Sequence, residues 1–464
     1  MRATSVLKMA NTVLNAAIHP VAHPVVRPVS RPVSGPVSQP VTPAVVRPVI
    51  HPADPFFRPE YRADAIPESR SRGHANRGVD VFARVLVRGF CAATLMMAGL
   101  PAYALPAHFD DPMRTPSQLT PLALQSPVEA VTRAGGGLIA VGLRGHILRQ
   151  SPGDTHWRQV PVPVSDDLVA VSFPTPMQGW AVGHDGVVLH TADGGMTWQL
   201  QLDGPRAYQT MVSYYQRAEQ QGVSGATQEL TRLREVASGA VAWPFLDVWF
   251  RDAAHGYIVG AFGMIMSTED GGQHWLPLLD HTDNPRHYHL YAIKGQAPSQ
   301  IPMPAQATAQ DPRKDPKNVL ATGDVFIVGE HGLVLRLDSV TQRFVAQPLA
   351  YRGSLFGVAF QGERVVVYGL RGHAFVSARE GDPWQAVSTG TTFGIVGATL
   401  LTDGDLLLAT EYGRLLSLPP GALATHLAGT TSSGAAMGIA QASDGRIVAA
   451  TSLGPKTFDL DAQP

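Results

Sequence analysis

The sequence contains only one cysteine, Cys91, among its 464 residues. This residue lies within an apolar stretch that Gly99 and Pro101 interrupt, so the stretch is short for a membrane-spanning helix. If the stretch is removed on export, the mature chain has no thiol. That excludes disulfides, cysteine-ligated metal sites and cysteine nucleophiles.

An excess of positive charge is also missing. The whole chain has a net charge of −1, and residues 107–464 contain 24 Lys and Arg against 32 Asp and Glu, a net charge of −8. Binding to nucleic-acid phosphates requires a basic surface. We therefore expect no nucleic-acid partner.

The first part of the chain has two compositions. Residues 1–79 contain a Pro- and Val-rich four-residue repeat, which cannot fold around a core. Residues 80–106 combine two arginines, an apolar run and small residues at its end, the pattern of a secretory signal peptide. We expect translation to begin near Val79 or Val81 and the signal to be cleaved, giving a periplasmic protein. A membrane anchor is the alternative.

A glycine-centred phrase that follows a short β-branched run recurs through the rest of the chain. The uninterrupted steps are 40 or 41 residues long, and the copies end at Gly142, Gly183, Gly260, Gly329, Gly369, Thr410 and Thr451. Repeats of this length, made of short strands and glycine turns, are typical of β-propeller blades. Residues 107–464 are therefore predicted to form an all-β, seven-bladed propeller of four-stranded blades.

Two steps are longer than the repeat and indicate insertions. Residues 203–242 have apolar residues at helical spacing, so we predict a pair of helices between the second and third blades. Residues 296–320 are rich in Pro, Gln, Lys and Asp, which favours an irregular loop in the fourth blade. The last copy is one strand short, and we predict that a segment within 113–125 supplies its outer strand and closes the ring.

The second and third copies end in an Asp-box, the pattern Ser/Thr-x-Asp-x-Gly-x-Thr-Trp, complete at 191–198 and with His replacing the second Thr at 268–275. We expect a structural role, in which the carboxylate accepts backbone N–H bonds, glycine allows the turn and tryptophan packs between blades. The residues concerned are Asp193, Gly195, Trp198, Asp270, Gly272 and Trp275.

With the Gly-Trp/Tyr-x-Val-Gly phrase that precedes each box, these copies resemble the photosystem II stability/assembly factor family of cyanobacteria and plastids. The resemblance covers residues from about 125 to 460. It implies a non-catalytic, cofactor-free BNR propeller that binds another protein while a membrane complex is assembled or stabilised. Relatives in non-photosynthetic bacteria are exported proteins, some associated with envelope transport systems, so an accessory role there is the expectation outside photosynthesis.

The turns between the second and third strands of the blades are expected to share one face with the helical insertion. They contain charged and imidazole side chains, and we expect this face to dock a membrane-protein partner, with arginine as a bidentate donor. The alternative is that these turns are polar only because they are solvated. The candidates are Arg144, His146, His184, Asp185, Glu330, His331, Arg371, His373 and Glu411. We expect the protein to be a monomer, peripheral to the membrane at most.

Three other hypotheses compete with protein binding. His287 and His289, with nearby carboxylates, are a weak candidate for a zinc or nickel site. A sialidase-type glycoside hydrolase would also contain Asp-boxes, but such propellers have six blades and an Arg-Ile-Pro motif that this sequence lacks before its first box. A glycan-binding propeller would use aromatic residues of the inserted helices: Tyr208, Tyr214 and Tyr215. We expect no enzymatic activity.

Overall fold

The computed structural model describes residues 111–238, 243–296, 324–378, 382–431, 435–458 and 460. The chain divides into two compact units, 1–102 and 103–464, and all described residues belong to the second. The predictions for 1–79, for the signal peptide at 80–106 and for nearly all of the loop insertion at 296–320 fall outside the described residues. Within the described part, no helix is long and apolar enough to span a membrane.

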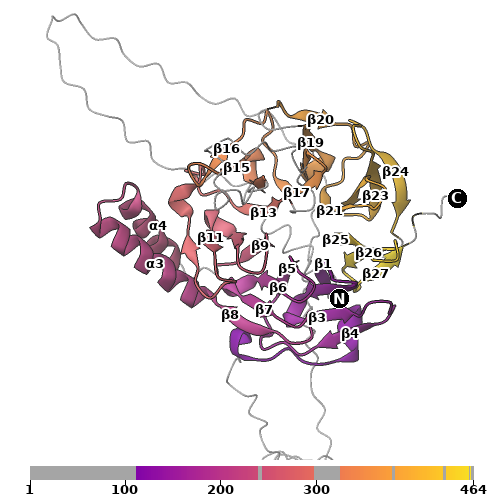
Figure 1. The fold of residues 1–464 in the computed structure, drawn as a ribbon, viewed down its shortest axis with the longest axis horizontal. Helices are drawn as coiled ribbons and strands as arrows, with labels where there is room; N and C mark the ends of the chain where they lie inside the picture. The colour runs from indigo at the N-terminus through magenta and orange to yellow at the C-terminus, as the bar shows by residue number, and fades with distance from the viewer. Residues whose placement is uncertain are drawn as a thin grey trace, which may run out of the picture. The chain divides into compact units, whose positions relative to one another are not determined.

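Seven antiparallel sheets surround a central axis, and the innermost strand of each lies beside those of its two neighbours, which closes the ring (Figure 1). This confirms the predicted seven-bladed propeller. The first blade consists of β1 (Val128–Ala134), β2 (Gly137–Gly142), β3 (Ile147–Gln150) and β4 (Trp157–Val160), and the second of β5 (Leu168–Ser172), β6 (Gly179–Gly183), β7 (Val188–Thr191) and β8 (Gln199–Leu202). The third and fourth blades consist of β9 (Phe245–Phe250), β10 (Gly256–Gly260), β11 (Ile265–Thr268) and β12 (Leu276–Pro277), and of β13 (Leu290–Gly295), β14 (Val325–Gly329), β15 (Val334–Asp338) and β16 (Arg343–Ala346). The last three blades consist of β17 (Leu355–Gln361), β18 (Arg364–Gly369), β19 (Ala374–Ser377) and β20 (Gln385–Val387); of β21 (Ile395–Leu400), β22 (Leu406–Thr410), β23 (Arg414–Leu418) and β24 (His426–Thr430); and of β25 (Ala436–Gln441), β26 (Ile447–Thr451) and β27 (Lys456–Phe458).

The core of the propeller lies between adjacent blades. Second strands such as β2 and β6 are buried along their whole length, because a neighbouring sheet covers each of their faces. Their β-branched and small residues suit this environment. Between the second and third blades, Trp180 stacks on Phe250 with ring centroids 3.6 Å apart, so aromatic packing joins these two sheets.

The insertion between the second and third blades is a helical hairpin, as predicted. It consists of α3 (Gly204–Gln220) and α4 (Ala226–Ser238). Asp203 caps α3 by accepting a hydrogen bond of 2.8 Å from the backbone N–H of Arg206, and a proline occupies the first turn. Tyr215 is fully buried and its hydroxyl donates a 2.7 Å hydrogen bond to Asp280, which fixes the hairpin to the link before β13.

The prediction for segment 113–125 was wrong. The segment forms two 3₁₀ turns, Pro112–Arg114 and Pro121–Gln125, and the sheet of the last blade has three strands among the described residues. Pro121 has no N–H to donate to a strand ladder. Ala123 is instead fully buried in a cluster formed by the first and last blades. The segment therefore covers the seam between these blades without forming a strand there.

Candidate functional site: the turn face

The turns between the second and third strands share one conformation in the first five blades. Each is a three-residue 3₁₀ turn whose middle residue has a positive φ: Arg144 (57°), Asp185 (51°), Phe262 (57°), His331 (56°) and Arg371 (57°). Non-glycine residues rarely adopt this left-handed conformation. Its recurrence means that the surrounding structure imposes it. We call the surface formed by these turns and the equivalent turn at Glu411 the turn face.

Close contact with the links between blades holds the turns in this conformation. A Cβ atom on Gly145 would lie 2.2 Å from the carbonyl oxygen of Val164, so only glycine fits against the link. On the other side, the backbone N–H of Arg144 donates a 2.7 Å hydrogen bond to Asp167. The turn is therefore rigid, while the Arg144 side chain is exposed.

The third blade differs, because the helical hairpin covers its turn. Arg232 of α4 donates a 3.0 Å hydrogen bond to the carbonyl oxygen of Phe262, and the N–H of Phe262 donates to Nδ1 of His289 at 3.1 Å. Arg232 is also ion-paired with Glu229 at 3.0 Å, and both side chains are largely buried. The hairpin thus lies on the same side of the propeller as the turn face.

The nine sequence candidates divide by exposure. Arg144, Asp185, His331, Arg371, His373 and Glu411 are exposed, and His184 is half-buried. His146 and Glu330 are buried. Glu330 accepts a 2.8 Å hydrogen bond from the backbone N–H of His289, while burial and the nearby Arg144 guanidinium lower the pKa of His146. These last two residues support the turns and are not available to a docked protein.

The exposed arginines at two equivalent turns have unused hydrogen-bonding capacity. Within the described ranges, neither Arg144 nor Arg371 has a carboxylate at ion-pair distance, although many other arginines in the propeller do. A guanidinium offers several N–H donors in a planar fork. Both side chains can therefore bind an external carboxylate without first breaking an internal ion pair.

Aromatic side chains in the links add to this face, and the sequence analysis missed them. Tyr288 stacks with His331 at a centroid distance of 4.6 Å, and Tyr351 lies 4.8 Å from His373. In the sixth blade, Phe393 lies 4.7 Å from Tyr412. The sequence does contain a pattern that could have identified them, because each of these three copies has an aromatic residue two to four positions before its inner strand.

On the opposite face, the Asp-box carboxylates bind within their own turns. Asp193 accepts hydrogen bonds of 2.9 Å from the N–H groups of Met196 and Thr197. Asp270 accepts one of 2.9 Å from the N–H of His274. Burial opposes the ionisation of both carboxyls, but these hydrogen bonds outweigh it and lower each pKa. The box tryptophans, Trp198 and Trp275, are buried.

The two histidines of the metal candidate make separate contacts. Nε2 of His287 lies 3.9 Å from Glu229, whereas Nδ1 of His289 accepts from Phe262. Burial, followed by the Arg232 charge, lowers the pKa of His287 to about 4. In the part of the chain that the structure describes, no group of three or more His, Cys, Asp or Glu residues is arranged to hold a metal ion.

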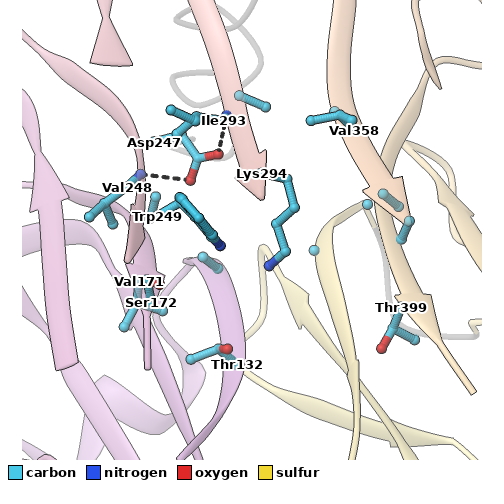
Figure 2. A pocket seen from close by; sticks show the side chains of 18 of the residues that line it. Thr132, Val171, Ser172, Asp247, Val248, Trp249, Ile293, Lys294, Val358 and Thr399 are labelled. Atoms are coloured by element: carbon cyan, nitrogen blue, oxygen red, sulfur yellow. Dashed lines mark hydrogen bonds between the residues drawn. The ribbon is translucent and has the colours of Figure 1, made fainter. Parts of the chain in front are cut away.

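A central cavity of about 580 Å³ runs between the two faces, lined by the inner strands of all seven blades (Figure 2). Its carboxylate on β9, Asp247, accepts hydrogen bonds of 2.8 Å from the N–H groups of Val248 and Ile293, as the dashed lines in Figure 2 show. Burial raises the pKa of Asp247 to about 6. Asp247 therefore joins the inner strands of the third and fourth blades.

Comparison with known proteins agrees with this architecture. A family model described as photosynthesis system II assembly factor YCF48 matches residues 150–219 and 232–297. Photosystem II assembly protein Ycf48 of Synechococcus sp. (strain JA-2-3B'a(2-13)) is 30% identical over 139 residues, which span 27% of this chain and 40% of that protein. Part of this chain is therefore similar in sequence to photosystem II assembly factors.

Two further comparisons show how far the likeness extends. The photosystem II assembly lipoprotein Ycf48 of Synechococcus sp. (strain CC9902) is 24% identical over 167 residues, 35% of this chain and 40% of that protein. A solved structure of YCF48 bound to a D1 peptide is 16% identical, has a TM-score of 0.50, and covers 75% of this chain and 97% of its own. The sequence matches thus span less than half the length of these curated relatives. The structural match shows a shared fold.

Proposed function

We propose that this photosystem II assembly factor-like propeller is an exported, non-catalytic protein that holds a subunit of a membrane complex while the complex is assembled. The subunit docks on the turn face. The observation that carries this proposal is the pair of exposed arginines, Arg144 and Arg371, which stand at equivalent turns without internal ion pairs among the described residues. The similarity to photosystem II assembly factors supports the assembly role.

The chemistry of the face suits a polypeptide with acidic side chains. Arginine binds carboxylates through two parallel hydrogen bonds, and aromatic residues and arginine are enriched at protein interfaces. The turns present the arginines on a rigid backbone, so little conformational entropy is lost from the main chain on binding. The ring pairs of Tyr288 with His331, which are stacked, and of Tyr351 with His373, which are tilted, provide apolar area beside the charges.

The hydrolase alternative finds less support in the cavity. Sialidase chemistry requires three convergent arginines to hold the substrate carboxylate. Among the described residues that line the central cavity, Arg251 is the one arginine, and it is paired with Asp252 at 3.2 Å. The Asp-box carboxylates are likewise occupied by hydrogen bonds within their turns.

The identity of the client depends on the source of the protein. The related proteins are named for photosystem II, and one solved relative is bound to a D1 peptide. In a non-photosynthetic bacterium, we propose an envelope transport complex as the client. The signal-peptide pattern at 80–106 and a relative named as a lipoprotein support export.

Site-specific photocrosslinking in cells tests the proposed face. One variant places a photoreactive phenylalanine at Tyr412 on the turn face, and the matched control places it at Met196 on the Asp-box face; these side chains are 61% and 51% exposed. We expect a membrane-complex subunit to crosslink to position 412 and not to 196, and the complex to become less abundant when the gene is deleted. Crosslinks from position 196 alone, or unchanged abundance of the complex, would contradict the proposal.

A further inference from the structure

All seven inner strands have the same irregularity at the same position. In each, the pairing with the second strand of the blade shifts between the first and third residues, so the second residue is an extra one that forms a β-bulge. A bulge changes the direction in which nearby side chains point. Seven bulges in register therefore define one level of the central cavity.

The bulged residues make one end of the cavity apolar. All seven line the cavity and are half-buried: Glu129, Val169, Leu246, Tyr291, Phe356, Val396 and Met437. We call this set the collar. It lies at the turn-face end, because Val128, which precedes Glu129, pairs with Gly142 at the start of the first turn. Six of its seven members bring carbon-rich side chains to a surface that solvent can reach.

The other end of the cavity contains polar side chains as well as Trp249. Three residues further along the inner strands, the lining side chains include Thr132, Ser172, Lys294 and Thr399. Lys294 pairs with Phe326 near the Asp-box face, far from the collar along the strand. Figure 2 shows the Lys294 side chain extending from its strand into the open space of the cavity, on the side where Thr132 and Thr399 lie.

Lys294 has no ion-pair partner among the described residues. The Asp247 carboxylate attracts Lys294 electrostatically, but each of its two oxygens also accepts a hydrogen bond, one from the backbone N–H of Val248 and one from that of Ile293. The other cavity acid is Glu129 in the collar, and burial raises its pKa to about 7, so it is partly neutral near pH 7. An ammonium group that lines a cavity and has no ion pair favours an anionic ligand.

We propose that the central cavity binds a small amphipathic carboxylate, with its anionic head on Lys294 and the nearby hydroxyls and its apolar body against the collar. The volume lies within the range of small-molecule sites. The ligand would cover apolar area that otherwise faces water. This site does not include the turn-face arginines, so a negative result here would not contradict the proposed docking function.

Calorimetric titration of the full chain with dodecanoate tests the site. We expect one dodecanoate bound per chain, and weaker binding of dodecyltrimethylammonium, which has the same tail and a positive head. Lys294→Met should weaken dodecanoate binding at least tenfold. The matched control is Lys456→Met, since Lys456 on β27 is the other lysine in the described ranges and lies outside the cavity; this variant should bind like the wild type.

A second variant tests the collar separately. Val396→Asp places a carboxylate on a half-buried position of the collar, where water can solvate it, and should weaken dodecanoate binding at least tenfold. Unchanged thermal unfolding of the ligand-free variants would show that they are folded. The proposal would be overturned if dodecanoate did not bind, if both cavity variants bound it like the wild type, or if the cationic analogue bound equally well.

Discussion

Two carboxyl groups near one face of the propeller and two near the other have pKa values shifted in opposite directions. On the Asp-box face, hydrogen bonds from the turn lower the pKa of Asp193 and Asp270 despite some burial. Toward the turn face, burial raises the pKa of Glu129 and of Asp166 to about 7, with further contributions from Asp167 and Asp185 respectively. The Asp-box carboxylates thus hold their own turns, whereas Arg144 and Arg371 on the turn face are exposed and have no ion pair among the described residues.

The largest expected effect is the loss of an Asp-box carboxylate. Asp193→Ala removes an acceptor that serves two backbone N–H groups and the hydroxyls of Thr191 and Thr197. We expect the free energy of unfolding to fall by about 3 kcal/mol, because four charge-assisted hydrogen bonds are lost together. Urea denaturation measures this change. The matched turn-face variant, Asp185→Asn, should change it by less than about 0.5 kcal/mol; equal losses would contradict the comparison.

Carboxyl groups near the two faces should also contribute to stability with opposite pH dependence. The pKa of Glu129 is about 7 in the folded state against 4.5 for the free group. Between pH 4.5 and pH 7 the folded state therefore holds a proton that the unfolded chain has released. The contribution of Glu129 to the free energy of unfolding falls as pH rises over this range, by at most about 1.4 kcal/mol for each pH unit. Asp193 and Asp270, with lowered pKa values, contribute stability that is lost only in acid.

Urea midpoints at pH 5.5 and 7.5 check this sign. Relative to the wild type, Glu129→Gln should have a higher midpoint at pH 7.5 than at pH 5.5, because glutamine cannot ionise. The pH dependence that remains in this variant combines Asp166 and Asp247, whose pKa values are also raised, with half-buried histidines such as His287, whose lowered pKa values act in the opposite direction. An unchanged difference between the two midpoints in Glu129→Gln would contradict the raised pKa of Glu129.

A small effect on stability is also expected at Arg144, whose backbone conformation would suit glycine better than arginine. Arg144→Gly removes a non-glycine residue from a left-handed conformation with φ 57°. Glycine relieves the backbone strain of the folded state, but it also has greater conformational freedom in the unfolded chain. Because these two effects nearly cancel, we expect the free energy of unfolding to change by less than about 1 kcal/mol. Capture of the client should nevertheless fall severalfold. A large loss of stability would mean that the arginine supports the fold.

Local patterns in the sequence were sufficient to predict the blades and the helical hairpin. Glycine turns alternate with β-branched runs in each repeat of about 40 residues, and this pattern predicts the strands. The spacing of apolar residues in 203–242 predicts the helices. Closure of the ring was not predictable in this way, because it depends on contacts between opposite ends of the described chain. Burial of Ala123 between the first and last blades is such a contact.

Individual side-chain positions were harder to predict than the strands. The burial of His146 and Glu330 depends on how each turn packs against its link, although neighbouring turn residues are exposed. The collar was missed because each inner strand contains a bulge, which places its second and fifth residues on the same cavity wall. A strict alternation of faces along a strand would put these residues on opposite sides.

The most direct test of the account is the affinity of the crosslinked client subunit for two charge-reversal variants. One variant carries Arg144→Glu and Arg371→Glu on the turn face. The control carries Arg133→Glu and Arg158→Glu, which change the same total charge at exposed positions outside the turn face. The account predicts at least tenfold weaker binding for the turn-face variant and nearly unchanged binding for the control. Equal affinities for the two variants would contradict it.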